Sequence, residues 1–465
     1  AVIVGQRRSL FPIAAAATAF SLAVGFPAAD PDTYWHLASG QWMIEHREIL
    51  RADVFSATIA GRSYALGEWL GEVVLAAAFG VGGWPGLVLL RSTLVAIAAF
   101  CAARIARRGG GSAAAAAIVL GVGFVATRSR WIDRPALFTF VLFAVVLDLL
   151  FAARAGSRRA LIAVPPLLLL WANLHGGYVV GLALVGAFAA EALLLRRPVA
   201  RAFLLVLALS TIVTFADPET FGLGGAAGHA LAPPRFIREE APPDVLEASG
   251  AVFALFLAGV LGVAILRGAG LLQVLLLAPL IWLALSGQRH LAFFLIAALP
   301  LLADGLAAPL HVATRWVASR ALSRYRPPAS AAALGVAALV IAAVASAVAV
   351  PTGPDERRYP VGALPALASG SGLVLNEYDW GGFLILRAPG RPVFIDGRLF
   401  PFESAGVLEA YREAVELRPG WREVLDRYAV RQVLLRPDRP LTVALRDSGW
   451  TVQAEDAQFV LLGRP

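Results

Sequence analysis

The sequence contains few charged residues, a single cysteine and no lysine. Charged residues make up 15% of the chain and hydrophobic residues 58%, which excludes an ordinary soluble globular protein. The one cysteine, Cys101, lies within an apolar stretch, so the chain forms no intramolecular disulfide. Because lysine is absent, all 40 basic residues are arginine, and together with the abundant alanine this indicates a GC-rich bacterial genome.

The chain has a formal net charge of +8. In a soluble protein this excess would suggest nucleic acid as a partner, but here the arginines cluster in short loops between apolar stretches. We therefore expect these arginines to contact membrane lipids, and we expect no nucleic-acid partner. The sequence shows no internal repeat, and no cleavable signal is evident after the Arg7-Arg8 pair.

About eleven apolar stretches have roughly the length needed to cross a membrane. They predict an all-α polytopic membrane bundle of about eleven transmembrane helices. The stretches are residues 10–28, 84–106, 112–127, 135–153, 160–174, 176–195, 202–216, 250–267, 270–286, 290–304 and 329–351.

The loops between these stretches alternate in charge. When the N-terminus is placed in the cytoplasm, the arginine-rich loops face the cytoplasm and the acidic loops face outward, as the positive-inside rule requires. This predicts a multi-pass protein of the bacterial cytoplasmic membrane whose C-terminus lies outside. The predicted transmembrane domain covers residues 1–351, with outer loops at 29–83 and 217–249, and an extracytoplasmic domain covers 352–465.

The apolar segment at 67–80 is short for a membrane span. Counting it as a span would reverse the charge bias of every later loop, so we interpret it as an interfacial or re-entrant helix on the outer side. A plain short transmembrane helix is the alternative. Glu68 and Glu72 lie one helical turn apart in this segment and therefore share a face.

The tail from about residue 352 is polar and has an α/β pattern. Roughly a hundred residues are enough for a hydrophobic core of its own. The expected elements are strands at 372–376 and 391–396, a helix at 404–428, a strand at 432–436, a helix at 441–448 and a strand at 458–462.

Two aspartates, Asp30 and Asp32, directly follow the first apolar stretch. A carboxylate at the water-facing mouth of a helix bundle can hold a divalent cation such as Mg²⁺ or Mn²⁺, or take a proton from a hydroxyl. Both aspartates are therefore candidate catalytic residues and candidate metal ligands. The alternative is that the Asp30-Pro-Asp32 run only caps the first outer helix.

Further polar residues gather at the outer ends of the apolar stretches. Ionisable groups cost free energy there unless they are paired or hydrated, so their accumulation favours a site. His36 and Glu68 are further candidate catalytic residues. The candidates for binding the substrate or its phosphate are Arg128, Arg130, Arg134, His175, Arg289 and His290.

Each of these features also has a purely structural interpretation. Trp35 and His36 suit an interfacial aromatic pair, and the outer arginines suit lipid anchors. His175 precedes two glycines and suits the satisfaction of backbone groups at a helix break. The runs Tyr378-Asp-Trp-Gly-Gly382 and Asp396-Gly-Arg398 are most simply turns.

Four short runs carry a resemblance to a known group of proteins. They are Asp30-Pro-Asp-Thr-Tyr-Trp-His-Leu37, Glu68-Trp-Leu-Gly-Glu72, Tyr378-Asp-Trp-Gly-Gly382 and Phe394-Ile-Asp-Gly-Arg398. These runs are similar to motifs of a poorly characterised group of bacterial membrane proteins with GT-C-like architecture. The order of spans, acidic first outer loop and C-terminal outer domain also resembles the GT-C superfamily of integral-membrane glycosyltransferases.

The resemblance implies an inverting glycosyltransferase of cell-envelope glycans. Such an enzyme moves a sugar from a polyprenyl phosphate or diphosphate to an acceptor outside the cytoplasm, which here is an unspecified glycan, lipid or protein. It implies Asp30 as the main catalytic carboxylate and the outer arginines as the phosphate-binding half of the site. Some members of the superfamily use a lysine for the lipid phosphate, and this chain has none.

Two other functions stay open. The first is a catalytically silent scaffold or accessory subunit that keeps the GT-C-like fold, which the missing lysine favours. The second is a transporter of lipid-linked glycans, although transporters commonly place ionisable groups near the middle of the membrane and contain repeated halves.

Overall fold

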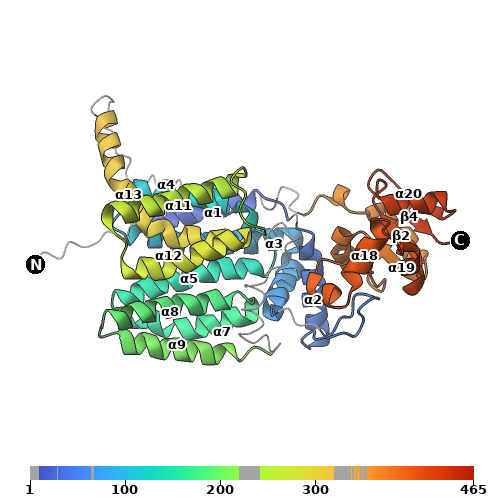
Figure 1. Ribbon diagram of the computed structural model, residues 1–465, viewed down its shortest axis with the longest axis horizontal. Coiled ribbons are helices and arrows are strands. Elements are labelled where there is room, and N and C mark those ends of the chain that lie inside the picture. The colour runs from blue at the N-terminus through green and yellow to red at the C-terminus, as the bar shows by residue number, and fades with distance from the viewer. Residues whose placement is uncertain are drawn as a thin grey trace, which may run out of the picture. The chain divides into compact units, whose positions relative to one another are not determined.

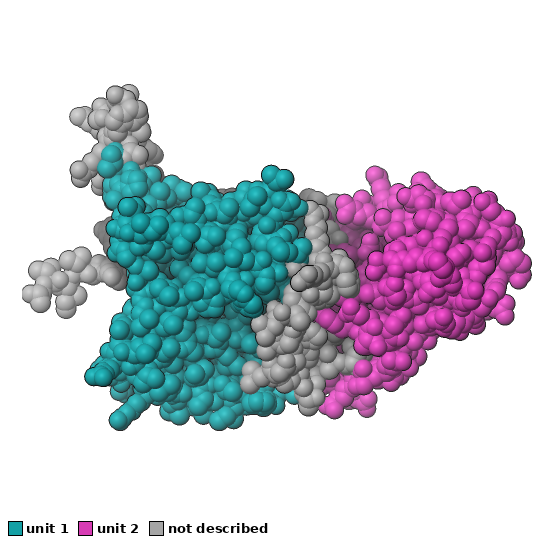
Figure 2. Space-filling view, viewed as in Figure 1, with its two compact units in different colours: residues 1–26, 88–351 teal, residues 27–87, 352–465 magenta. Residues whose placement is uncertain are grey.

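The computed structural model describes residues 10–28, 30–63, 67–218, 241–318 and 353–465, with scattered positions between 337 and 348. The chain forms two compact units (Figure 2): unit 1 contains residues 1–26 and 88–351, and unit 2 contains residues 27–87 and 352–465. Most of the expected span at 329–351 and of the outer loop at 217–249 lies outside the described residues.

Unit 1 is a bundle of helices, and most of these helices run roughly parallel to one another (Figure 1). Its helices are α1 (Phe11–Val24), the second half of α3 (Trp69–Arg107), α4 (Ala113–Ala126), η1 (Arg128–Arg130), α5 (Ala136–Arg154), α6 (Arg158–Ile162), α7 (Val164–Leu174), α8 (Tyr178–Leu194), α9 (Ala200–Thr214), α11 (Ala248–Arg267), α12 (Leu271–Ser286), η3 (Gln288–His290) and α13 (Leu291–Ala318).

Each expected apolar stretch that lies in the described part of the chain is mainly helical. Four helical segments there are long and apolar enough to cross a membrane, and several shorter apolar helices accompany them. The four are 69–107, 136–154, 248–267 and 288–312. The helical membrane bundle is therefore confirmed, whereas the number of about eleven spans stays a prediction.

Two buried carboxylates inside the bundle are paired with arginines. Asp148 and Glu191 each accept contacts from two guanidinium groups, which offsets the cost of burying a charge. The pairs are Arg104 to Asp148 at 3.0 Å, Arg108 to Asp148 at 2.5 Å, Arg154 to Glu191 at 2.9 Å and Arg197 to Glu191 at 2.8 Å. These acidic residues therefore have a structural explanation.

Helix α3 is broken at Gly83, whose backbone has φ 57° and ψ −147°. Only glycine adopts this conformation readily, and Pro85 follows it. The break falls between the segment at 67–80 and the apolar stretch at 84–106. The first part of α3 belongs to unit 2, and its position relative to a membrane stays a prediction.

Unit 2 contains a four-stranded sheet in the order β1-β2-β4-β3. β1 (Leu373–Asn376) pairs parallel with β2 (Val430–Leu435), and β4 (Val460–Gly463) pairs antiparallel with β2 and β3 (Thr451–Glu455). The helices are α2 (Asp32–His46), the first part of α3, η4 (Glu356–Arg358), η5 (Val361–Ala363), α15 (Leu364–Ser369), η6 (Tyr378–Trp380), α16 (Gly381–Arg387), α17 (Leu399–Ser404), α18 (Val407–Val415), α19 (Trp421–Arg427) and α20 (Pro440–Asp447). The tail is α/β, as its sequence indicates.

Three details of the tail differ from the sequence prediction. Residues 391–396 form no strand: the Asn376 side chain donates to Ile395 O at 2.8 Å and accepts from Phe394 N at 2.8 Å, replacing regular strand pairing. The helix expected at 404–428 is divided, with Leu417 and Gly420 at positive φ between α18 and α19. Strand β3 was missed because its residues are mostly exposed and lack a clear apolar alternation.

The segment around residues 30–63 and the C-terminal tail share the interior of unit 2. Tyr34, Trp35 and Ala38 of α2 pack in one hydrophobic cluster with residues of β1 and α16. Backbone hydrogen bonds join Ala57 N to Val393 O at 2.9 Å and Val393 N to Phe55 O at 3.0 Å. Segments separated by about 300 residues therefore fold as a single body.

A fully buried arginine ties the same two segments together. The Arg398 guanidinium lies 2.6 Å from Asp53 Oδ1 and donates to both oxygens of Asp396, at 2.8 Å and 2.5 Å. Asp53 also accepts hydrogen bonds from Ser56 N and from the Ser56 hydroxyl. All three charged side chains are fully buried, so each depends on the others for its stability.

Candidate functional site

The acidic pair lies at the start of α2 in unit 2. Asp30 Oδ1 accepts a hydrogen bond from Asp32 N at 2.9 Å, and Asp30 O accepts one from Thr33 N at 3.2 Å. Asp30 thus satisfies backbone donors that the first turn of a helix leaves unpaired. The N-cap residue of α2 is Pro31, so Asp30 supports the start of the helix from the preceding position, in line with the structural alternative in the sequence.

The paired glycines of the Tyr378-Asp-Trp-Gly-Gly382 run allow close packing next to this helix start. A Cβ on Gly382 would lie 3.0 Å from Pro31 O and 3.3 Å from Trp35 N. A Cβ on Gly381 would lie 2.3 Å from Ile395 O. The run forms η6 and the start of α16, so it is more than a turn, and it brings the C-terminal motifs against α2.

A cluster of one histidine and two glutamates connects α2 to the first part of α3. His36 Nδ1 lies 3.1 Å from Glu72 Oε1 and 3.6 Å from Glu68 Oε1. His36 and Glu72 are buried, with 3% and 5% of their surfaces exposed. Gly40 permits this approach because a Cβ there would lie 2.2 Å from Glu72 O.

This cluster is the group of described residues that offers three ligands for a metal ion. One nitrogen of His36 and one oxygen each of Glu68 and Glu72 lie within 4.8 Å of one another. A nitrogen and two carboxylate oxygens suit Zn²⁺ or Mn²⁺. The sequence predicted Asp30 and Asp32 as possible ligands of the cation; among the described residues they are not part of such a three-ligand group.

Buried aromatic residues adjoin the acidic pair. Tyr34 lies edge-to-face with Tyr359, and Tyr359 stacks on Phe383, each with ring centroids 5.0 Å apart. Burial first, and then the negative charge of Asp30, raise the pKa of Tyr359 to about 12. Tyr359 therefore keeps its hydroxyl proton at neutral pH. Sequence reasoning missed Tyr359 because nothing in its local pattern relates it to residue 30.

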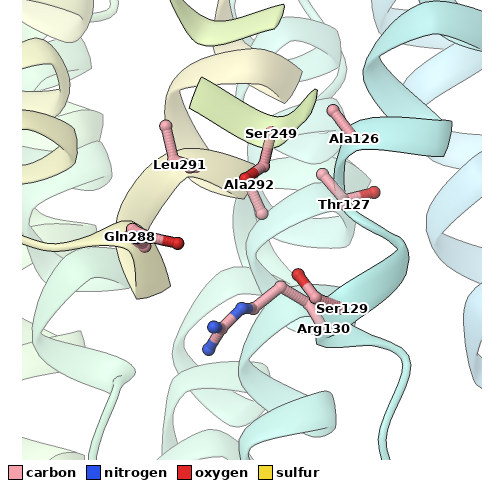
Figure 3. Close-up of a pocket in the computed structure, with 8 residues that line it drawn as sticks. All are labelled: Ala126, Thr127, Ser129, Arg130, Ser249, Gln288, Leu291 and Ala292. Carbon is pink, nitrogen blue, oxygen red and sulfur yellow. The ribbon is translucent and has the colours of Figure 1, made fainter. Parts of the chain in front are cut away.

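The candidate arginines lie in unit 1, in the short turns that precede α5 and α13. Arg130 lines a small pocket with Gln288 and Ser249 (Figure 3). Arg128 instead places its guanidinium 5.1 Å from the ring centre of Phe26, a cation–π contact. The other residues of the pocket are Ala126, Thr127, Ser129, Leu291 and Ala292. Arg130 is thus the candidate that lines this pocket, together with polar groups that the sequence did not single out.

His175 serves backbone groups at the break between α7 and α8. Its Nδ1 accepts from Gly177 N at 3.0 Å and lies 2.9 Å from the Thr139 hydroxyl. Burial first, and then the nearby charge of Arg289, lower the pKa of His175 to about 4. The ring is therefore neutral at neutral pH, and these two hydrogen bonds agree with the structural interpretation of His175.

Arg289 and His290 lie side by side in η3. Arg289 Nε lies 3.2 Å from His290 Nε2, and His290 Nδ1 lies 3.1 Å from Leu283 O. Since Nδ1 can donate to the carbonyl, Nε2 is left to accept from Arg289. In the turn after η1, the backbone carbonyl of Arg134 accepts a hydrogen bond from Leu137 N at 3.0 Å. Arg289 also lies close enough to His175 for its positive charge to lower the pKa of the His175 ring.

The structure adds an ion pair that the sequence did not predict. Arg91 of α3 lies 2.6 Å from Asp133 Oδ2, and both side chains are buried. The same guanidinium donates to Ala23 O at 3.3 Å and to Phe26 O at the end of α1. Asp133 therefore has a structural role, because the ion pair holds the chain at the end of α1 against the turn before α5.

Comparison with known proteins reveals similarity in fold alone. No family description matches the sequence, and no curated protein sequence matches it. The archaeal oligosaccharyltransferase AglB from Archaeoglobus fulgidus, in complex with an inhibitory peptide and a dolichol-phosphate, superposes with a TM-score of 0.61 at 12% identity. The match covers 91% of this chain and 69% of that one.

A second similar structure matches over nearly the whole of both chains. ArnT from Cupriavidus metallidurans bound to undecaprenyl phosphate has a TM-score of 0.55 at 15% identity, covering 97% of each chain. A complex of the Archaeoglobus fulgidus oligosaccharyltransferase with Zn and sulfate has a TM-score of 0.54 at 15% identity, covering 92% of this chain and 67% of that one. The chain therefore shares the overall fold of these structures, which supports the expected architecture of a helical bundle with a C-terminal α/β part.

Proposed function

We propose that the protein is an inverting membrane glycosyltransferase that takes a sugar from a polyprenyl phosphate or diphosphate and passes it to an acceptor outside the cytoplasm. The observation that carries the proposal is the acidic pair at the start of α2, held against the C-terminal motifs in a chain with a GT-C fold. Two solved structures of that fold contain dolichol-phosphate and undecaprenyl phosphate.

In the proposed reaction, a hydroxyl-type acceptor attacks the anomeric carbon of the donor sugar. Its oxygen forms the new glycosidic bond while the bond from the anomeric carbon to the phosphate oxygen breaks, and the phosphate leaves with the electron pair. Asp30 takes the acceptor proton, and Asp32 is the second carboxylate beside it. Attack on the face opposite the leaving group inverts the anomeric centre.

The departing phosphate requires neutralisation of charge more than protonation. Guanidinium groups match phosphate oxygens with paired hydrogen bonds, so we assign this role to arginines of unit 1. The residues proposed to bind substrate or phosphate remain Arg128, Arg130, Arg134, His175, Arg289 and His290. Among them, Arg130 and Arg289 are the stronger candidates, because Arg128 contacts Phe26 and His175 is neutral.

We further propose that His36, Glu68 and Glu72 hold a divalent cation. When bound, the cation would stabilise negative charge on phosphate oxygens. The nitrogen ligand favours Zn²⁺ or Mn²⁺ over the Mg²⁺ that two aspartates alone would suggest. The donor set fits because three ligand atoms already lie within 4.8 Å of one another.

The proposed location is the bacterial cytoplasmic membrane, with the N-terminus inside and residues 352–465 outside. In this arrangement the C-terminal residues of unit 2 help to select the acceptor, which is a glycan, a lipid or a protein. The support is the direct packing of α16 against the start of α2 at Gly382.

Incubation of the purified protein with radiolabelled polyprenyl-phosphate sugars and a panel of extracytoplasmic acceptors tests the proposal. We expect label to move from the lipid to an acceptor, with inversion of the anomeric centre. Binding of the lipid without transfer, across the whole panel, would favour a silent scaffold. Movement of the intact lipid-linked sugar across a vesicle membrane would instead favour a transporter.

A further inference from the structure

Gly397 in the Phe394-Ile-Asp-Gly-Arg398 run lies directly against the second carboxylate of the acidic pair. A Cβ on Gly397 would lie only 1.9 Å from Asp32 Oδ1 and 3.1 Å from Trp35 Nε1. Gly397 is not among the residues with positive φ, so its backbone conformation does not require glycine. The space occupied by the Asp32 carboxylate is therefore the reason that a side chain does not fit.

The turn that carries Gly397 is held in place from several directions. Arg398 N donates to Asp396 Oδ1 at 3.0 Å, and the Arg398 guanidinium lies between Asp396 and Asp53. A Cβ on Gly381 would lie 2.5 Å from Asp396 Cβ, so α16 packs tightly on the same turn. The Asp32 carboxylate is the end of a side chain, which can rotate about its single bonds, whereas the turn is backbone. Extra volume at position 397 would therefore move Asp32 before it moves the turn.

Trp35 provides an internal reporter next to the same carboxylate. Its side chain is buried, and its indole Nε1 has no hydrogen-bond partner among the described residues. Trp35 Nε1 and Asp32 Oδ1 both lie close to the position that a Cβ on Gly397 would occupy. A change in the position or charge of the carboxylate will therefore change the surroundings of this indole.

We propose that residues 396–398 form a positioning element for Asp32, in which Gly397 sets the orientation of the Asp32 carboxylate. The catalytic meaning of this inference rests on the proposed glycosyl transfer, whereas its geometric content does not. The run 394–398 would then arrange the proposed reacting carboxylates as well as contribute to packing. The ion pairs of Arg398 with Asp53 and Asp396 hold the turn in place beside Asp32.

The kinetic test compares Gly397→Ala with Gly80→Ala, a matched glycine of unit 2 whose Cβ would meet nothing within 4 Å. We expect Gly397→Ala to lower kcat at least about tenfold with little change in KM for the donor, because small displacements of reacting groups cost rate. In an Asp32→Asn background, Gly397→Ala should change the rate less than about twofold. Full activity of Gly397→Ala, or an equal loss in both backgrounds, would overturn the proposal.

A spectroscopic test separates the inference from the proposed function. In protein labelled with 5-fluorotryptophan, the ¹⁹F resonance of Trp35 is assigned by its loss in Trp35→Phe. We expect this resonance to change position in Asp32→Asn and in Gly397→Ala but not in Gly80→Ala, and we expect the change caused by Gly397→Ala to differ in the Asp32→Asn background. An unchanged resonance in Asp32→Asn, or the same change from Gly397→Ala in both backgrounds, refutes the positioning role. The expected spectra without any glycosyl transfer would leave the positioning role standing and refute the proposed function alone.

Discussion

His36 contributes the nitrogen that distinguishes its cluster from a simple pair of acidic residues. A ring nitrogen beside two carboxylate oxygens shifts the preference from Mg²⁺ towards Zn²⁺ or Mn²⁺. The cluster joins α2 to the first part of α3, so a bound cation would also hold these helices together. Metal binding can therefore be measured without any assumption about the reaction.

We predict that His36→Ala lowers the affinity of the protein for Zn²⁺ at least about tenfold, because it removes one of three ligands. The measurement is isothermal titration of metal-free protein, followed by elemental analysis of the dialysed sample. His46→Ala is the matched control, since His46 lies at the other end of α2 and is exposed. Equal Zn²⁺ affinity in both variants would remove the metal site.

At the scale of elements, unit 2 depends on contacts between the loop at 47–63 and the residues after β1. Arg398 is central to these contacts because it neutralises Asp53 and Asp396 while fully buried. It also lies over the rings of Phe55 and Phe402, at 5.3 Å and 5.7 Å. Removal of the guanidinium would leave two buried carboxylates facing each other.

We predict that Arg398→Met destabilises unit 2 by about 3–5 kcal/mol, the usual cost of breaking a buried ion pair from one side. Urea-dependent pulse proteolysis of the detergent-solubilised protein gives the change in unfolding free energy. Arg387→Met is the control, because Arg387 pairs with Glu356 on the surface and such pairs contribute about 0–1 kcal/mol. Similar stability of the two variants would show that the buried triad is not needed.

The sequence predicts helices best where one local property determines them. The apolar stretches at 84–106 and 135–153 are helical because their length and hydrophobicity leave few other solutions. The strand expected at 391–396 fails because the Asn376 side chain captures the backbone of residues 394 and 395. Strand β3 has no buried face of its own and so lacks a periodic signal.

The candidate site shows the same division between local and distant information. Asp30 and Asp32 are recognisable because both lie in one short run after an apolar stretch. The contacts from His36 to Glu72 and from Asp32 to Gly397 depend on tertiary packing, which spacing in the sequence does not specify. The pairing of Arg91 with Asp133 was not predictable from the sequence, because Arg91 lies in α3 and Asp133 lies 42 residues further along, in the turn before α5.

At the scale of the whole molecule, the distribution of charge predicts an orientation in the membrane. We predict that the turn before α6 faces the cytoplasm and that unit 2 faces outward. The test places single cysteines at the exposed positions Arg158 and Val443, after Cys101→Ser, and labels intact cells with a membrane-impermeant maleimide. Val443→Cys should react in intact cells, and Arg158→Cys only after permeabilisation. The reverse pattern would contradict the orientation.

The most direct test of the account is glycosyl transfer by the purified protein and by variants of its acidic pair. From a labelled polyprenyl-phosphate sugar, we predict that the wild type transfers the sugar and that Asp30→Asn lowers the rate about a hundred- to ten-thousandfold, the usual cost of losing a general base. Asp379→Asn, at an exposed aspartate of the same unit, should keep the wild-type rate. Equal rates in the wild type and in Asp30→Asn and Asp32→Asn would contradict the assignment of the acidic pair as the reacting carboxylates.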